Sequence, residues 1–75
     1  MDTNTAAIAH RVDAARRAKG VGTLPLAKAT GIPRTTLTRQ LAGQTDFTLA
    51  GFLRIGEALD IPRETWLRDI TGVAA

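Results

Sequence analysis

Residues 30–43 read TGIPRTTLTRQLAG and hold the side chains best suited to chemistry. Arg34 and Arg39 carry guanidinium groups, which donate several hydrogen bonds, and the threonines carry hydroxyls that both donate and accept. The stretch contains no acidic residue, although ordinary surface helices mix glutamate with their basic residues. Threonine is a mediocre helix former, so helix propensity is given up here for short hydroxyls. This composition indicates a surface that hydrogen-bonds to a partner.

The other reactive side chains do not form a catalytic or metal-binding set. The chain has no cysteine and one histidine, His10, which excludes disulfides, thiolate metal sites and the usual zinc ligand sets. No nucleophile is paired with a base, no two carboxylates share a helix face, and no glycine-rich phosphate loop is found. We therefore expect no enzymatic activity, no metal and no cofactor.

The whole chain has a net charge of +3, and its basic residues gather in the first half. Residues 10–39 contain seven lysines and arginines against Asp13 alone, whereas residues 40–75 contain three arginines against five acids. Such a basic half suits a polyanionic partner, and a solvated charged face is the plainer alternative.

Length and composition set the fold class. The chain has 75 residues, of which 44% are hydrophobic and 23% charged, so it has room for one small globular domain. Alanine and leucine are common and runs of β-branched residues are missing, which favours an all-helical fold. No apolar run approaches the roughly 18 residues of a membrane helix, and the start of the chain lacks the pattern of a signal peptide. We expect no membrane association and a cytoplasmic location.

Helical spacing and capping residues predict five short helices. The first covers about residues 5–19 and the third about residues 34–42, whereas the second is capped by Gly22 or Thr23 and ends at Gly31 after about seven residues. The fourth is capped by Thr48 and reaches Leu59, the fifth follows Asp60-Ile61-Pro62 and runs to about Ile70, and residues 71–75 form a frayed tail. Helices of one or two turns do not persist alone in water, so packing must hold them. In the fourth helix the apolar stripe is Leu49, Phe52, Ile55 and Leu59. Its internal glycine, Gly56, predicts the close approach of a neighbouring helix.

The Gly-Ile-Pro interruption predicts a tight turn between the second and third helices. Gly31 can adopt the left-handed conformation that ends a helix, Ile32 can plug the core, and Pro33 fixes the next helix start. In the third helix, at about 100° per residue, the leucines share one edge while Thr35 and Arg39 lie opposite. The same helix-start chemistry is used twice, because GIPRTTL and DIPRETW resemble each other.

This arrangement resembles the phage repressor and Cro type of helix-turn-helix regulators. The residues that carry the resemblance are Leu26-Ala27, Gly31-Ile32, Thr36-Leu37-Thr38-Arg39, Gly43 and the segment TLAGFLRIGEALDI. It covers about residues 8–67, and RTTLTRQLAG with FTLAGFLRIGEALDIP also resembles short actinobacterial and actinobacteriophage members. The resemblance implies an all-α, lambda repressor-like bundle of five short helices in one domain, residues 1–75, with a helix-turn-helix core at about 22–43.

The chain departs from this family's pattern at several positions. Thr23 stands where a phosphate-gripping glutamine is common, and Pro33 replaces the usual serine or threonine. Leu24 and Pro25 stand where polar residues are usual, and Leu53 stands where a charged residue is typical. Leu24 and Leu53 therefore predict extra apolar surface.

The resemblance implies a role for each polar residue around the third helix, which would lie in the major groove of DNA. Arginine pairs with guanine, and threonine offers a hydroxyl, or a methyl group to thymine. The residues implied to read bases are Arg34, Thr35, Thr38 and Arg39. Those implied to contact the DNA backbone are Thr23, Lys28, Thr36, Thr45 and Thr48, with Gln40 contacting either bases or backbone. Thr48 is equally suited to be a plain N-cap, and Arg16, Arg17 and Lys19 would add phosphate neutralisation.

The partner implied is double-stranded DNA with a palindromic operator, bound by a homodimer. The predicted dimer interface lies in residues 61–73 and uses Trp66, Leu67 and Ile70, with Trp66 serving either the core or the interface. We expect no small-molecule ligand, and a place of action in the cytoplasm of a bacterial cell or phage-infected host. A complete chain would be Cro-like, and a fragment would be the DNA-binding part of a larger repressor. The alternative is a helix-turn-helix module that binds a protein, as an antitoxin or a recombination accessory protein does.

Overall fold

Every regular element in the described part of the chain is an α-helix. A computed structural model describes the backbone of residues 3–71 and the side chains of residues 5–68. The helices are α1 (Thr3–Ala18), α2 (Thr23–Thr30), α3 (Arg34–Leu41), α4 (Leu49–Ala58) and α5 (Arg63–Thr71). The predicted all-α class and the five helices are confirmed. The predicted tail starts too early, because Thr71 ends α5, and residues 72–75 lie outside the described residues.

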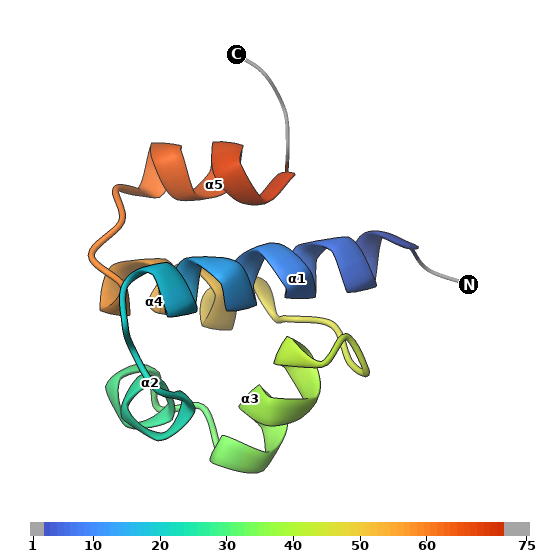
Figure 1. Cartoon of the computed structure of the whole chain (residues 1–75), viewed down its shortest axis with the longest axis vertical. Helices are drawn as coiled ribbons and strands as arrows, with labels where there is room; N and C mark the ends of the chain where they lie inside the picture. Colours follow the sequence, from blue (N-terminus) through green and yellow to red (C-terminus); the bar gives the residue numbers. More distant parts are fainter. Residues whose placement is uncertain (1–2, 72–75) are drawn as a thin grey trace.

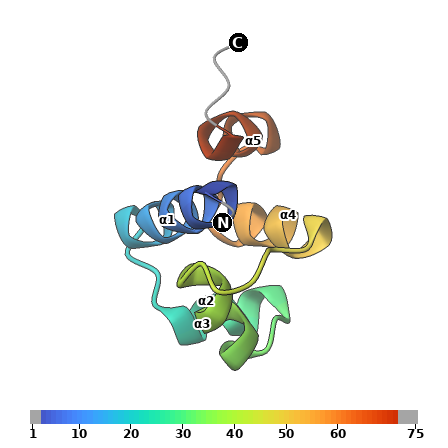
Figure 2. The same ribbon diagram turned by 90° about the vertical axis from the view of Figure 1, so that its right-hand side faces the viewer.

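The helices lie in three layers. Figures 1 and 2 show α1 and α4 in the middle, α5 on one side of them, and α2 with α3 on the other. Both middle helices touch α5, and α2 packs against α3 and α4 while α3 packs against α1. The helix-turn-helix pair therefore stands at one face of the molecule, on the side away from α5.

Each helix contributes at least one fully buried side chain to a common core. Val12, Leu26, Leu37, Ile55 and Trp66 come from α1 to α5 in order, and each is at most 1% exposed. Burying a large apolar side chain contributes about 1.5–3 kcal/mol. Because α2 and α3 have 8 residues each, this shared core is what keeps them helical.

A close approach between α4 and α5 surrounds Gly56, as predicted. A Cβ atom at this position would lie 2.5 Å from Cδ1 of Trp66, so only glycine fits. The indole Nε1–H of Trp66 donates to the carbonyl of Phe52 at 2.9 Å, and the two rings stack with centroids 5.1 Å apart. Trp66 is thus a core residue, and its side chain, 1% exposed, has no surface to offer a second subunit. Its assignment to a dimer interface is wrong for this reason.

The turn between α2 and α3 has the predicted construction. Gly31 adopts the left-handed conformation with φ of 76°, and its N–H donates to the carbonyl of Ala27. Pro33 precedes α3 with φ of −55°, and Ile32 packs against the core. Buried Thr30 adds a bond that the sequence did not suggest, because its hydroxyl accepts the N–H of Ile32 at 3.3 Å. The turn is therefore fixed from both ends.

Leu49 does not belong to the apolar stripe of α4. It is 71% exposed, whereas Phe52, Ile55 and Leu59 are buried. A helix turns by about 100° per residue, which places Leu49 about 90° from the middle of the face that the other three form. Helical spacing alone was therefore not enough to decide whether Leu49, the first residue of α4, faces the core.

Candidate nucleic-acid interface

The outer face of α3 brings the four predicted base-reading residues together. Leu37 faces the core and fixes the rotation of the helix, which leaves the opposite face in solvent. Arg34, Thr35, Thr38 and Arg39 are all exposed and line one shallow surface hollow. The grouping agrees with the set that the family resemblance implied, and spacing had placed Thr35 and Arg39 opposite the leucines. The contacts of each residue with bases stay a prediction.

The two arginines of this face are available for a ligand. Within the described part of the chain, neither Arg34 nor Arg39 forms an ion pair or a side-chain hydrogen bond. Thr38 differs, since its hydroxyl donates to the carbonyl of Arg34 at 2.9 Å. With its proton engaged in the helix, Thr38 presents an acceptor oxygen and a methyl group rather than a donor.

Gln40 cannot contact bases or phosphates from its place in the structure. It is 4% exposed, because it follows Leu37 by three residues and so lies on the inner face of α3. Its Nε2 donates to the carbonyl of Asp46 at 3.3 Å, and its Oε1 is buried with no hydrogen-bond partner among the described residues. The predicted DNA contact of Gln40 is therefore wrong. Its polar side chain suggested an outward position, whereas its spacing from Leu37 was the signal for an inward one.

The residues predicted to contact the DNA backbone are spread over three elements. Lys28 and Thr36 are exposed on α2 and α3, and Thr45 is exposed in the loop after α3. Thr23 is half-buried at the first position of α2, after Gly22, which has no side chain to cap the helix. The first N–H groups of α2 are therefore left without a side-chain cap, at the end of the helix dipole that favours anions.

Thr48 is the N-cap of α4. Its hydroxyl oxygen accepts the N–H of Gly51 at 2.9 Å, which confirms the capping alternative. An accepting hydroxyl keeps its own proton, so a contact between Thr48 and a phosphate is still a prediction.

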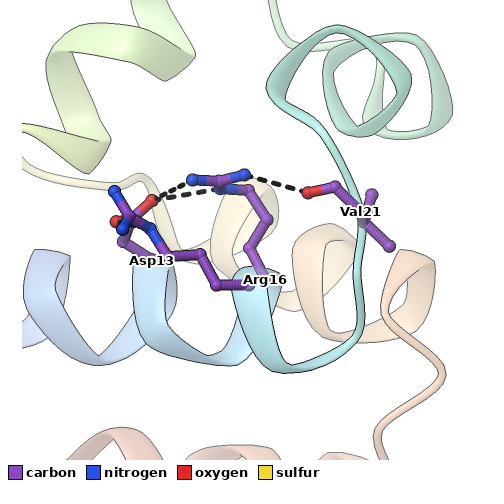
Figure 3. Close-up of polar contacts among 4 residues, drawn as sticks. Asp13, Arg16 and Val21 are labelled. Carbon is purple, nitrogen blue, oxygen red and sulfur yellow. Dashed lines mark hydrogen bonds and ion pairs between the residues drawn. The ribbon is translucent and has the colours of Figure 1, made fainter.

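Arg16 is a structural residue rather than a phosphate contact. Figure 3 shows its guanidinium between Asp13 and the carbonyl of Val21, which it reaches at 3.0 Å. Its Nε and Nη2 atoms donate to Oδ1 of Asp13 at 3.0 and 2.7 Å, and the side chain is only 14% exposed. Arg17 pairs with Oδ2 of Asp13 at 2.9 Å but is 74% exposed. The expected phosphate contact of Arg16 is wrong, because its guanidinium fastens Val21, in the connection between α1 and α2, to α1. The phosphate contacts of Arg17 and Lys19 stay predictions.

An apolar groove lies where the loop before α4 meets α1, α4 and α5. Its volume is about 460 Å³. It is lined by Thr5, Ile8, Asp46, Phe47, Thr48, Leu49, Phe52 and Leu67. Leu67, from the predicted interface, is 39% exposed on its rim, and the side chain of Ile70 lies outside the described residues. Of the two other apolar surface predictions, Leu24 is 46% exposed, whereas Leu53 is half-buried against the core.

The described residues hold neither a metal-binding cluster nor a helix that could span a membrane. Among its described residues, no group of three or more histidine, aspartate and glutamate side chains is placed to hold a metal ion. None of the helices in residues 3–71 combines the length and the apolar character needed to cross a bilayer.

The fold is similar to that of a solved controller protein. No protein-family model matches the sequence, and no curated protein matches it. Among solved structures, the chain is similar to the restriction-modification controller protein C.AhdI from Aeromonas hydrophila, with a TM-score of 0.79 and 26% sequence identity. The similarity covers 87% of this chain and 98% of that one. This likeness supports the helix-turn-helix regulator fold that the sequence predicts.

Proposed function

We propose that the protein binds double-stranded DNA in a sequence-specific manner and regulates transcription, with α3 in the major groove. The observation that carries the proposal is the outer face of α3, where two unpaired arginines and two threonines share one hollow. An acid-free face of this kind matches the acceptors and methyl groups that the major groove displays. The similarity to a restriction-modification controller supports the same function.

The proposed division of labour follows the placement of the side chains. Arg34 and Arg39 donate paired hydrogen bonds to guanine, and Thr35 and Thr38 contact thymine methyl groups. The proposed backbone contacts come from Thr23, Lys28, Thr36, Thr45 and Thr48. These contacts fix the register of α3 in the groove but carry no sequence information themselves.

We further propose that two copies bind a palindromic operator. One helix in one groove reads few base pairs, and a dimer doubles that number at half-sites about one helical turn apart. The apolar groove supports this arrangement, since Leu49 and Leu67 both line it and are both exposed. Leu67→Gln should shift the protein toward monomer in sedimentation velocity. Leu24→Gln, which changes an exposed leucine outside the groove, is the matched control and should leave the mass unchanged.

Two regulatory settings are proposed for the DNA-binding function. The first is that of a Cro or immunity repressor of a phage or prophage, acting in the cytoplasm. The second is control of restriction-modification genes, which the similarity to C.AhdI favours. Footprinting on the protein's own promoter and on neighbouring genes would distinguish them. The protein-binding alternative fits less well, because the basic surplus coincides with the helix-turn-helix residues.

The test of the proposal is selection from a random duplex library followed by a salt titration of the enriched sequence. We expect an enriched palindrome whose affinity falls steeply with salt, because lysines and arginines displace counterions from phosphates. Weak binding without enrichment, or binding that is insensitive to salt, would contradict the proposal and favour a protein partner.

A further inference from the structure

We propose that Gln40 is a positioning residue, which holds the loop of residues 43–47 in the place where Thr45 meets a DNA phosphate. The inference rests on the proposed DNA-binding function, and it assigns Gln40 a role different from the direct DNA contact that its sequence position suggested. It is carried by the hydrogen bonds on both sides of this loop and by the burial of the Gln40 amide.

The loop is attached to α3 at its start and at its far end. The N–H groups of Gly43 and Gln44 donate to the carbonyls of Gln40 and Arg39 at 3.1 and 2.9 Å. The Nε2 of Gln40 then reaches across the loop to the carbonyl of Asp46 at 3.3 Å. The residue between these attachments is Thr45, which is exposed.

The loop is also attached to the first turns of α1. The hydroxyl of Thr5 donates to Oδ1 of Asp46, so Asp46 is held through both its side chain and its carbonyl. A Cβ atom on Gly43 would lie 3.5 Å from Cα of Ala6, which shows how closely the loop follows α1. Figures 1 and 2 show the loop passing between the end of α3 and the beginning of α1.

A glutamine at position 40 is not explained by packing alone. Its side chain is almost fully buried, and its Oε1 has no hydrogen-bond partner within the part of the chain that the structure describes. Burying an unsatisfied amide oxygen is unfavourable, and leucine or methionine would occupy the same space without that cost. The one thing that the amide adds is its bond to the carbonyl of Asp46. Gln40 thus gives up some stability for a fixed loop.

A fixed loop matters for DNA binding because ordering a mobile segment opposes association. With Asp46 and Gln44 held, Thr45 presents its hydroxyl from a loop that is already ordered. The loop follows directly on α3, so fixing it also fixes the distance between the proposed phosphate contact and the proposed base contacts.

The first experiment measures the loop without DNA. In Gln40→Met, which keeps the length and burial of the side chain but cannot donate, NMR order parameters of residues 44–47 should fall from about 0.85 to below about 0.6. Ile55→Val, a mild change in the core away from the loop, is the control and should leave these order parameters unchanged. Unchanged order in a folded Gln40→Met variant would overturn the proposal.

A second measurement needs no variant of Gln40. In the wild-type protein the side-chain amide protons of Gln40 should exchange with solvent more slowly than those of exposed Gln44. Equal exchange rates for the two glutamines would contradict the hydrogen bond on which the proposal depends, even if Gln40→Met failed to fold.

The third experiment joins the loop to DNA binding through a double-mutant cycle. Thr45→Val should weaken binding to the enriched operator by about tenfold in the wild type, as expected for a hydrogen bond to a charged group. In Gln40→Met the same change should cost less than about twofold, because the loop no longer delivers Thr45. Equal losses in both backgrounds, or no loss in the wild type, would overturn the inference. Failure of the wild type to bind any duplex would instead contradict the proposed function, while the NMR measurements would still judge the anchoring of the loop.

Discussion

The starts of α3 and α5 are built alike, although the two helices lie on opposite sides of the middle layer (Figure 1). The segments are GIPRTTL, residues 31–37, and DIPRETW, residues 60–66. In each, the first residue is left-handed, with φ of 76° at Gly31 and 58° at Asp60. In each, the isoleucine that follows packs against the core, and the last residue is fully buried. The N–H of that buried residue donates to the carbonyl of the proline, at 2.9 Å in α3 and 2.8 Å in α5.

The two helices differ on the face that looks away from the core. Where α3 has Thr35 and Thr38, the equivalent positions of α5 have Glu64 and Leu67. The inward residues therefore build the same helix twice, and the outward residues decide its partner. An acid-free face suits an anion, whereas a face with a carboxylate and an exposed leucine suits protein contact and repels phosphate.

The largest expected effects come from the shared inward position, which is occupied by Leu37 and Trp66. Leu37→Ala should lower the free energy of unfolding by about 2–5 kcal/mol and Trp66→Ala by about 3–5 kcal/mol, since each leaves a cavity in the core. A domain of this length has roughly 4–11 kcal/mol of stability, so both variants are expected to be marginal. Urea unfolding followed by circular dichroism measures both. A mild loss in one and a severe loss in the other would break the structural equivalence of the two helices.

The outward face is tested by exchanging the residues that distinguish it. Thr35→Glu gives α3 the carboxylate of α5 and should weaken binding to the enriched operator by about 100-fold, through repulsion of DNA. The reciprocal change, Glu64→Thr, is the matched control and should leave binding unaltered. Both substitutions are on the surface, so the free energy of unfolding should change by less than about 0.5 kcal/mol. Binding by Thr35→Glu at wild-type strength would place the DNA elsewhere than on α3.

A smaller effect is expected from one arginine at a time. Arg39→Ala should cost about 1–3 kcal/mol of operator affinity and relax specificity at one base pair. Arg68, at the equivalent position of α5, is the control, and Arg68→Ala should change affinity little. Measuring affinity for the operator and for single-base variants separates two outcomes. Equal weakening on all sequences would make Arg39 a phosphate contact rather than a base contact.

Much of this fold depends on residues that lie close together in the chain and can be predicted from the sequence. Capping residues and helical spacing were enough for the five helices, the Gly31 turn and the outward position of Thr35 and Arg39, because these depend on residues close together in the chain. The grouping of Arg34 with Arg39 was implied by the family resemblance instead. The roles of Gln40 and Arg16 were missed. Asp13, three residues before Arg16 on the same helix, was a signal that the spacing offered for Arg16. The bonds to the main-chain carbonyls of Asp46 and Val21 had no such signal, because no pattern of side chains reveals which carbonyl a folded chain brings near.

Trp66 shows a different limit of sequence reasoning. An aromatic residue near the end of a small domain suits a core and an interface equally well. The choice depends on whether a cavity of the right shape exists in the same chain. Here Gly56 creates that space on α4, and the carbonyl of Phe52 accepts the indole N–H. Gly56 predicts the close approach of a helix, but which side chain fills the space depends on how α4 and α5 pack together.

The smallest predicted effect concerns the left-handed residues that open the two segments. Gly31→Ala should cost about 1–2 kcal/mol through backbone strain alone, because no atom lies within 4 Å of the added Cβ. Asp60→Gly should change stability by less than about 1 kcal/mol, since relief of strain is offset by the added freedom of the unfolded chain. Thermal melts give both values.

Gly31→Ala and Asp60→Gly also distinguish an effect on DNA binding from an effect on stability. Gly31 sets the angle between α2 and α3, so Gly31→Ala should weaken operator binding even at temperatures where the protein is fully folded. Asp60→Gly alters only the entry to α5 and should bind like the wild type. If both variants bound DNA with wild-type affinity when folded, the turn before α3 would serve the fold alone, as the turn before α5 does.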